Sequence, residues 1–361
     1  MTTQKIGVAV LGIGSMGGGH VQAFRSSPWV ERVVGYEPTA ERAKERGQEL
    51  GIPATTDLES LLHNPQIHLI TIASPNDTHC ELTLRALRAG KSVLCEKPMG
   101  VSLAETQLML AAERETGRFL QIGFECRYSK LYQMVKDWIG AGLIGQPLNS
   151  HCDYLCSEFL LRDSWRSKSP SGLIAEKLCH YLDLPRWWFE QPVVELYSQA
   201  APNFVSYFNY SDNHNILYRF ANGATSSLNF VMATAETFHG DPLRDMLDQQ
   251  WDDGHRLVYL LYGTKGAIET DVFRRRIRRW EFTDKPDKLH SKIVETVTFP
   301  SSADELWFHN APGQNIRISQ LVAEGRPPEL TAADSYESMK MVFAAELSER
   351  EQRIVKLNEL D

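Results

Sequence analysis

The octapeptide EKLCHYLD, residues 176 to 183, places two carboxylates and an imidazole at a spacing that suits proton transfer. If residues 173–189 form an α-helix, the side chains of Glu176, His180 and Asp183 lie on one face of it. A carboxylate one turn before a histidine can orient the imidazole or bind the same substrate hydroxyl. The alternative is a solvated face of an amphipathic helix, which explains the same spacing without chemistry.

Other polar and aromatic side chains nearby are candidates for a binding pocket. Lys177 lies at the edge of the same helical face. Upstream, cations and one indole crowd seven positions: Arg162, Trp165, Arg166 and Lys168. On a loop over a pocket the cations could bind an anionic substituent while the indole stacks on a sugar ring, although a solvated loop is the alternative. Three further candidates for substrate contact are Arg127, Tyr128 and Tyr154.

A second stretch suited to chemistry is the turn Gly12-Ile13-Gly14-Ser15-Met16-Gly17. Glycines at this spacing permit a tight turn and let backbone N–H groups approach a pyrophosphate at the start of a helix. Glu37 follows 20 residues after Gly17, where a carboxylate would accept both hydroxyls of an adenosine ribose. The pattern predicts NAD rather than NADP, because the carboxylate would repel a 2′-phosphate, a preference that the nearby Arg42 could weaken. A purely structural glycine turn is the alternative.

These residues require a framework that brings strand ends together. Apolar strands are expected at 6–11, 31–37, 67–74, 91–96 and 118–124, and helical stretches separate them. Strand–helix alternation at this spacing predicts a doubly wound parallel sheet with helices on both faces, which we assign to residues 1–125.

Two polar loops follow strands of this predicted sheet, at the edge where such sheets bind ligands. The first supplies four candidate cofactor contacts: Ser74, Pro75, Asn76 and His79. Helix capping explains that loop equally well. In the second, Glu96 and Lys97 are candidate cofactor contacts, and Lys97 could also hydrogen-bond a substrate hydroxyl. A surface salt bridge between these two residues is the alternative.

Residues 126–361 show a different pattern. Helical stretches are expected at 129–142, 173–189, 316–325 and 335–352, together with several two-faced strands between turn residues. This pattern predicts an α/β second domain with a mostly antiparallel, open sheet. The basic run FRRRIRRWEF, 273–282, is expected on a partly exposed strand, with its arginines in salt bridges at a subunit interface or at a solvated edge.

Composition excludes several classes of protein. The 361 residues favour two domains, and a formal net charge of −8 with scattered basic residues disfavours a nucleic-acid partner. No apolar run reaches the roughly 18 residues of a membrane span, and the N-terminal stretch does not resemble a signal peptide. The six cysteines form no CxxC pair. We therefore expect reduced thiols, no metal site and a cytoplasmic protein.

The motifs together resemble those of the Gfo/Idh/MocA family, named for glucose–fructose oxidoreductase and myo-inositol dehydrogenase. The resemblance rests on GIGSMG with Glu37, on SPNDTH and on AGKSVLCEKP, and it continues through GFECRY and LIGQP. It covers most of the chain, densely over the first 185 residues. It implies an NAD-binding Rossmann domain at 1–125 and a substrate-binding α/β domain at 126–361. The open sheet of that second domain often supports oligomers, so we expect a homodimer or homotetramer.

The resemblance also gives the segment 176–183 a role. Relatives commonly carry Asp-x-Gly-x-His here with a further Asp three residues later, and the first Asp and the His reach the substrate. Glu176 replaces the first Asp, a leucine replaces the Gly, and His180 and Asp183 match. Lys177 fills the variable position. From this segment we expect substrate contacts from Glu176, Lys177 and His180. We assign His180 as the base and Lys97 as a hydrogen-bond donor to the same oxygen, although the opposite split remains open.

The expected activity is transfer of a hydride between nicotinamide and a secondary hydroxyl of a sugar, sugar derivative or cyclitol, which could carry an anionic substituent. A second interpretation is NAD-dependent glycoside hydrolysis by transient oxidation, elimination and re-reduction. A third is a non-catalytic, NAD-binding regulatory protein, which the presence of Lys97 and His180 disfavours. Accumulation of NADH, or release of an aglycone without it, separates the first two.

Overall fold

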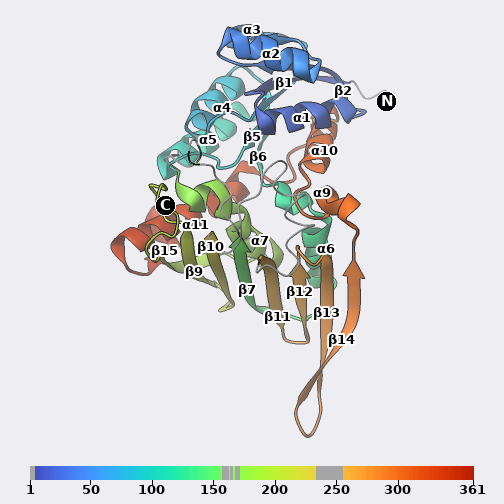
Figure 1. The fold of residues 1–361 in the computed structure, drawn as a ribbon, viewed down its shortest axis with the longest axis vertical. Helices are drawn as coiled ribbons and strands as arrows, with labels where there is room; N and C mark the ends of the chain where they lie inside the picture. The colour runs from blue at the N-terminus through green and yellow to red at the C-terminus, as the bar shows by residue number, and fades with distance from the viewer. Residues whose placement is uncertain (1–4, 157–161, 163–165, 167–170, 233–254) are drawn as a thin grey trace. The chain divides into compact units, whose positions relative to one another are not determined.

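The computed structural model describes residues 5–156, 162, 166, 171–232 and 255–361. The chain divides into two compact units (Figure 1). Unit 1 comprises Met1–Tyr128 and Asn310–Met339, and unit 2 comprises Ser129–His309 and Lys340–Asp361. This differs from the expected division at residue 125, because a late segment of the chain returns to unit 1.

The described part of unit 1 contains one sheet of six strands in the order β3-β2-β1-β4-β5-β6, and all neighbours are parallel. The strands are β1 (Ile6–Leu11), β2 (Val30–Tyr36), β3 (Ala54–Thr55), β4 (Leu69–Ile72), β5 (Ser92–Glu96) and β6 (Leu120–Gly123). Every residue of β1 and β4 is buried, so both faces of the sheet are covered. The predicted doubly wound sheet is therefore confirmed, with its switch of strand order between β1 and β4.

The helices that alternate with these strands, as the sequence predicts, are α1 (Ser15–Ser26), α2 (Ala40–Leu50), α3 (Leu58–Leu62), α4 (His79–Arg88) and α5 (Leu103–Thr116). Side-chain caps explain where several of them begin: the Asp57 carboxylate accepts a hydrogen bond from the Ser60 N–H, and the Ser102 hydroxyl accepts one from the Glu105 N–H. Gly51 and Gly117 end α2 and α5 in the left-handed conformation.

The returning segment places α10 (Ala311–Ala323) against α1. Ile318 is fully buried in the same apolar cluster as Val21 and Phe24 of α1. Two buried hydrogen bonds join the same helices, from Asn315 to His20 and between the hydroxyls of Ser319 and Ser27. Burial of an apolar face of α10 against this core is the physical reason why the segment belongs to unit 1.

Unit 2 is built on a mixed sheet. Its described strands run in the order β14-β13-β12-β11-β7-β10-β9-β8-β15, and every pair is antiparallel except β7 with β10. They are β7 (Pro147–Cys156), β8 (Val193–Gln199), β9 (Asn213–Phe220), β10 (Thr225–Met232), β11 (Arg256–Gly263), β12 (Gly266–Asp271), β13 (Arg276–Asp284), β14 (Leu289–Thr298) and β15 (Val355–Lys356). This confirms the expected mostly antiparallel sheet.

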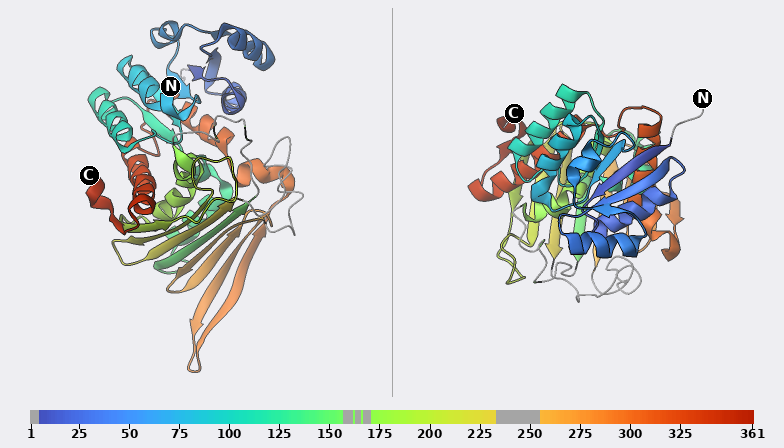
Figure 2. Two further views of the ribbon diagram at one scale, coloured as in Figure 1. Left: turned by 60° about the vertical axis from the view of Figure 1, so that its left-hand side comes forward. Right: turned by 90° about the horizontal axis from the view of Figure 1, so that it is seen from above.

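One face of this sheet packs against helices (Figure 2). Within the described residues, the α-helices outside unit 1 are α6 (Lys130–Gly140), α7 (Cys179–Phe189), α9 (Asp304–Trp307) and part of α11 (Ala332–Glu351). Buried residues alternate with partly exposed ones along β7 and β10, so the opposite face is open. The alternation of apolar and polar residues in these strands therefore matches a sheet with one covered face and one open face.

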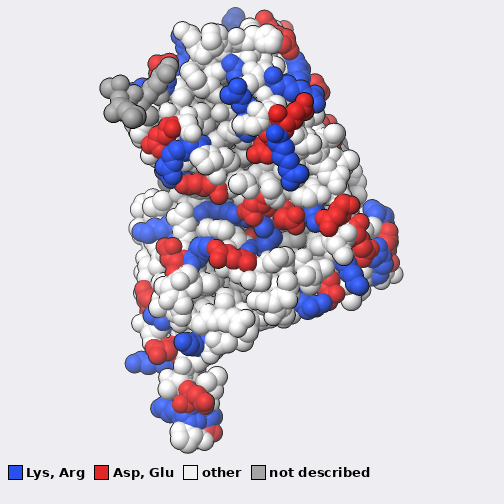
Figure 3. Space-filling model, turned by 180° about the vertical axis from the view of Figure 1, so that it is seen from behind, with Lys and Arg blue, Asp and Glu red and all other residues white. Residues whose placement is uncertain are grey.

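The basic run lies at β13, as predicted, and its arginines form ion pairs. Arg278 pairs with Glu269 at 2.7 Å, and Arg275 pairs with Asp304 at 2.9 Å. On the face drawn in Figure 3, acidic and basic side chains are interspersed. The first pair joins β13 to β12, and the second joins the residue before β13 to Asp304, so both ion pairs lie within this chain.

Two further expectations concern the whole chain. All six cysteines are in the described ranges, and all are buried without a disulfide. Among the described helices, none combines the length and the apolar character that crossing a bilayer requires.

Candidate active site

The glycine turn joins β1 to α1 in unit 1. Gly12 has a φ of +84°, a left-handed conformation that favours glycine. A Cβ on Gly17 would lie 1.8 Å from the carbonyl oxygen of Gly12, so a side chain there is sterically excluded. A Cβ on Gly12 itself would lie 2.9 Å from the Cα of Ser74, which places the turn directly beside the loop after β4. The turn therefore has the close backbone packing that a dinucleotide pyrophosphate requires.

An arginine of α2 braces this turn. Arg46 donates from Nε to the carbonyl oxygen of Ile13 at 2.8 Å, and from Nη2 to that of Gly14 at 3.0 Å. A Cβ on Gly18 would lie 3.1 Å from the Arg46 Nη2 atom. The glycine that extends the motif therefore leaves room for the guanidinium, a contact that the sequence analysis missed.

Glu37 lies just after β2 and is 6% exposed. Its Oε1 atom accepts a hydrogen bond from the Ile13 N–H at 3.0 Å, and Arg42 Nε lies 3.8 Å from Oε2. The carboxylate is thus held against the glycine turn, where a ribose would have to bind. Because Arg42 is largely exposed, the carboxylate dominates the local charge, which fits NAD.

An open groove of about 560 Å³ runs along this part of unit 1. It is lined by Gly14, Ser15, Gly18, Gly19, Gln22, Arg42, Arg46, Glu49 and Leu50. Ser15 and Met16, at the start of α1, are exposed and leave the helix N-terminus accessible. The free N-terminal N–H groups of α1 can therefore face an anion.

The loop after β4 is a 3₁₀ turn, Asn76–Thr78, that leads into α4. Asn76 is 4% exposed, and the Ser74 hydroxyl lies 2.6 Å from that of Thr78. His79 is buried, with Nδ1 2.8 Å from the carbonyl oxygen of Pro98 and Nε2 3.0 Å from that of Ser74. The imidazole therefore ties the loop after β4 to the loop after β5. Burial lowers the pKa of His79 from its usual value, against the opposing effect of the two carbonyl oxygens.

The loop after β5 carries Glu96 and Lys97. Glu96 is 5% exposed, and its Oε2 accepts a hydrogen bond from the Lys97 N–H at 3.3 Å. Lys97 is half-buried, and the Lys97–Pro98 peptide bond is cis. The alternative interpretation, a surface salt bridge between Glu96 and Lys97, does not fit Glu96, because its carboxylate is buried inside the unit.

In unit 2 the helix that carries EKLCHYLD is not a regular α-helix. A π turn, Ile174–Leu178, precedes α7. Projection at 100° per residue is not valid through a π turn, so the predicted shared face is not the relevant description. The relevant property is burial. Exposed fractions are only 4%, 1% and 1% for Glu176, His180 and Asp183. The alternative of a solvated helix face is therefore excluded.

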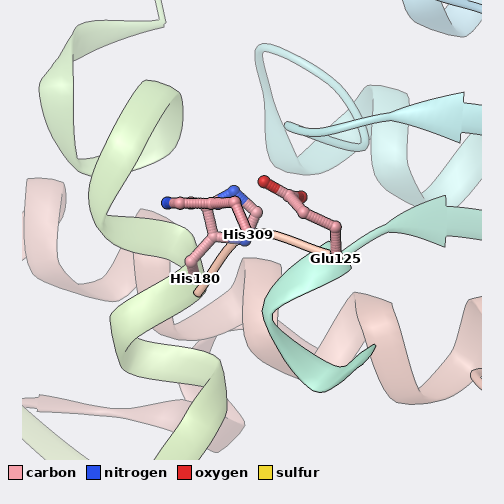
Figure 4. A group of neighbouring side chains, drawn as sticks. All are labelled: Glu125, His180 and His309. Atoms are coloured by element: carbon pink, nitrogen blue, oxygen red, sulfur yellow. The ribbon is translucent and has the colours of Figure 1, made fainter. Parts of the chain in front are cut away.

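Each of the three buried groups has a charged or aromatic neighbour within unit 2. The Glu176 carboxylate accepts from Arg166 Nε at 2.7 Å. Asp183 lies 3.6 Å from Nη2 of Arg186. The rings of His180 and His309 are nearly perpendicular, with centroids 5.7 Å apart (Figure 4); Glu125, also drawn there, belongs to unit 1. This end of the helix is thus rich in buried groups able to bind or move protons.

Two expected substrate contacts of unit 2 lie side by side. Tyr154 is 3% exposed and packs against Tyr181 and Phe230, with ring centroids 4.8 and 5.1 Å away. Lys177 is half-buried, with Nζ 5.9 Å from the Tyr154 ring centre. Tyr154 is therefore mainly a core residue, and Lys177 is the more accessible of the two.

The remaining expected contacts have other partners or lie elsewhere. Arg127 forms an ion pair with Asp334 at 2.6 Å, within unit 1. The Tyr128 hydroxyl accepts from Gln121 at 2.8 Å, and burial raises the pKa of Tyr128 to about 12. Trp165 and Lys168 lie outside the described residues.

Comparisons with known proteins match both parts of the chain to one family. Residues 6–124 match the model of the oxidoreductase family with an NAD-binding Rossmann fold, and residues 132–269 match the GFO/IDH/MocA C-terminal domain. Inositol 2-dehydrogenase from Streptomyces avermitilis is 32% identical over 77% of this chain and 84% of its own. Levoglucosan dehydrogenase from Pseudarthrobacter phenanthrenivorans is 25% identical over 92% of this chain and 93% of its own.

A solved structure of levoglucosan dehydrogenase in complex with NADH and levoglucosan has the same fold. Its TM-score is 0.80 at 22% identity, and the match covers 98% of this chain and all of that one. The relatives are dehydrogenases, the matching first domain binds NAD, and the glycine turn with Glu37 fits that cofactor. The chain therefore belongs to the GFO/IDH/MocA family and is an NAD-binding oxidoreductase.

Proposed function

We propose that the protein oxidises a secondary ring hydroxyl of a neutral cyclic polyol, with NAD as the hydride acceptor. The observation that carries the proposal is the burial of Glu176, His180 and Asp183 along a helix that contains a π turn. Burying ionisable groups costs free energy, and π turns occur frequently at functional sites. Three such groups on one helix are therefore better explained by chemistry than by stability.

The proposed roles of the residues follow from what each group can do. The His180 imidazole accepts the proton of the substrate hydroxyl, and Lys97 donates a hydrogen bond to the same oxygen as negative charge develops on it. When bound, NAD accepts the hydride from the carbinol carbon. The products are a ketone and NADH, and the proton leaves His180 for solvent.

Glu176 is proposed to bind a neighbouring hydroxyl of the substrate. Its contact with Arg166 favours the ionised carboxylate, which can only accept hydrogen bonds. The Glu176 carboxylate would therefore accept a hydrogen bond from a substrate hydroxyl and in this way select the orientation of the ring.

The charge of the substrate follows from the same contacts. Two arginines among the candidate substrate contacts already have carboxylate partners: Arg166, which was considered for an anionic substituent, binds Glu176, and Arg127 binds Asp334. Arg162 lies over the Tyr207 ring at 4.3 Å. These contacts favour a substrate without an acidic group. The relatives named for inositol and levoglucosan, both neutral cyclic polyols, support the same class.

A substrate panel tests the proposal. Purified protein with NAD would be offered myo-inositol, levoglucosan, glucose, glucuronate and an aryl glucoside, and NADH would be followed by absorbance. We expect NADH from at least one neutral cyclic polyol and at least about tenfold lower kcat/KM with glucuronate. Release of the aryl group without NADH would instead identify an NAD-dependent glycosidase, and no reaction with any compound would overturn the proposal.

We also propose that the protein is a homo-oligomer that uses the open face of the unit 2 sheet. Leu217 of β9 and Tyr262 of β11 are 54% and 41% exposed on this face. Exposed apolar side chains on a flat sheet are suited to pairing with a second copy. Light scattering that gives the mass of one chain would contradict this proposal.

A further inference from the structure

Three buried polar side chains form a row inside unit 1 that the proposed reaction does not use. Asn315 of α10 places Nδ2 2.7 Å from Nδ1 of His20 on α1. The other ring nitrogen, Nε2, lies 3.0 Å from Oε1 of Glu96, which is within ion-pair distance but does not meet the geometry of a hydrogen bond. Their exposed fractions are 1%, 1% and 5% for Asn315, His20 and Glu96. A row this deeply buried needs each contact to be favourable.

The row restricts where the proton of the imidazole can lie. With the amide nitrogen of Asn315 toward Nδ1, that ring nitrogen accepts a hydrogen bond. The proton of a neutral ring must then be on Nε2, where it faces the Glu96 carboxylate. The opposite tautomer would set two acceptors, Nε2 and Oε1, against each other.

The second oxygen of Glu96 extends the row to the loop after β5. Its Oε2 accepts from the N–H of Lys97 at 3.3 Å. On the other side, a Cβ on Gly123 would lie 2.6 Å from Oε1 of Glu96, so the absent side chain there makes room for the carboxylate. Both oxygens of Glu96 are thus held, one by α1 and the other by the backbone of the loop.

We propose that Asn315 and His20 are positioning residues that fix the Glu96 carboxylate and, through it, the backbone of Lys97. The inference rests on the proposed function only in giving Lys97 a substrate contact. In this arrangement Asn315 of α10 selects one tautomer of His20, and that tautomer holds Glu96 in the loop after β5. A side chain encoded more than 200 residues after the loop therefore contributes to the geometry of the proposed site.

The first test measures the tautomer directly. Imidazole ¹⁵N shifts of the full-length, cofactor-free protein distinguish rings protonated at Nδ1 from those protonated at Nε2, and loss of a signal in His20→Gln assigns His20. We expect an Nε2–H ring in the natural chain and a mixture in Asn315→Leu. An Nδ1–H ring in the natural chain, or an unchanged ring in Asn315→Leu, would overturn the proposal.

A matched variant separates positioning from simple docking of α10. Ser319→Ala also removes one buried hydrogen bond between α10 and α1, the 2.7 Å contact with Ser27, but it leaves His20 untouched. Amide hydrogen exchange at Lys97 would be compared in both variants. We expect exchange to rise roughly tenfold in Asn315→Leu and by less than about twofold in Ser319→Ala. Equal changes in hydrogen exchange in the two variants would contradict the positioning role and show that Asn315 only helps α10 to pack against α1.

Turnover adds a readout that keeps the two proposals apart. With a polyol that the panel shows to be oxidised, Asn315→Leu should lower kcat severalfold while the dissociation constant for NADH stays within about twofold. If no polyol is oxidised but the Lys97 amide responds as expected, the proposed function fails and the positioning role stands.

Discussion

The glycine turn of unit 1 and the helix around His180 in unit 2 are built on opposite principles. The turn depends on side chains that are absent: Gly12 has a left-handed φ, and a Cβ on Gly17 would collide with the backbone. The helix depends on side chains that are costly to bury, with Glu176, His180 and Asp183 all under 5% exposed. Substitution should therefore act on the turn by sterics and on the helix by charge and proton transfer.

The largest effect is expected at the helix. His180→Ala should lower kcat by about 10²-fold or more, because general acid–base assistance is typically of that size, while NADH affinity changes little. His290→Ala, on the exposed β13–β14 hairpin, is the control. Steady-state kinetics with an oxidised polyol and a fluorescence titration with NADH measure both quantities. A near-normal kcat would transfer the role of base to Lys97.

The next effect separates two glycines of one helix. Gly17→Ala should weaken NADH binding by roughly 10²-fold and lower stability, because its Cβ would meet the Gly12 oxygen at 1.8 Å. Gly19 lines the groove, but a Cβ there would have no protein atom within 4 Å, so Gly19→Ala should lose far less affinity and gain up to about 1 kcal/mol of stability. Binding titration and thermal denaturation test the pair. Similar losses in both variants would remove the steric explanation.

A smaller effect concerns the choice of cofactor. Glu37→Ser removes the carboxylate that accepts the Ile13 N–H and leaves Arg42 as the nearest charge. NADH affinity should fall about tenfold, and the preference for NADH over NADPH should shrink or reverse. Dissociation constants for both cofactors in the natural chain and the variant provide the measurement. Tighter NADPH binding by the natural chain would contradict the assignment of Glu37.

The smallest effect is a dependence of stability on pH. Burial lowers the pKa of His79 in the folded chain, so below about pH 6.5 the unfolded state binds more protons and stability falls as pH falls. One such group contributes a slope of at most ~1.4 kcal/mol per pH unit. His79→Gln should flatten the decline between about pH 7 and 5, as followed by chemical denaturation. An unchanged slope would show that His79 does not titrate there.

Much of unit 1 is predictable from sequence because its signals are local. The strand 6–11 is recovered as β1, and the helix 79–90 as α4, since apolar periodicity and glycine stops act over a few residues. The return of α10 is not predictable in this way. A helical pattern at 316–325 indicates a buried face, but nothing local specifies that Ile318 packs beside Val21.

The candidate site divides in the same manner. The motif residues of the turn and Glu37 could be found from spacing, whereas Arg46 lies in an ordinary charged helix and its contacts with Ile13 and Gly14 have no local signature. The π turn at 174–178 was hidden because the projection assumed a regular helix. For Arg46, the sequence offers one hint in Gly18. Glycine weakens a helix, and the missing side chain of Gly18 leaves room for the Arg46 guanidinium.

The return of α10 also has a consequence for biosynthesis. A ribosome releases residues 1–128 long before residues 310–339, with nearly all of unit 2 made in between. Until then, Val21 and Phe24 lack Ile318 as a neighbour, and His20 lacks Asn315. The cofactor-binding unit therefore begins synthesis before unit 2 and is completed only after most of unit 2 has been made. The incomplete unit exposes apolar surface during synthesis, and chaperones bind surface of this kind.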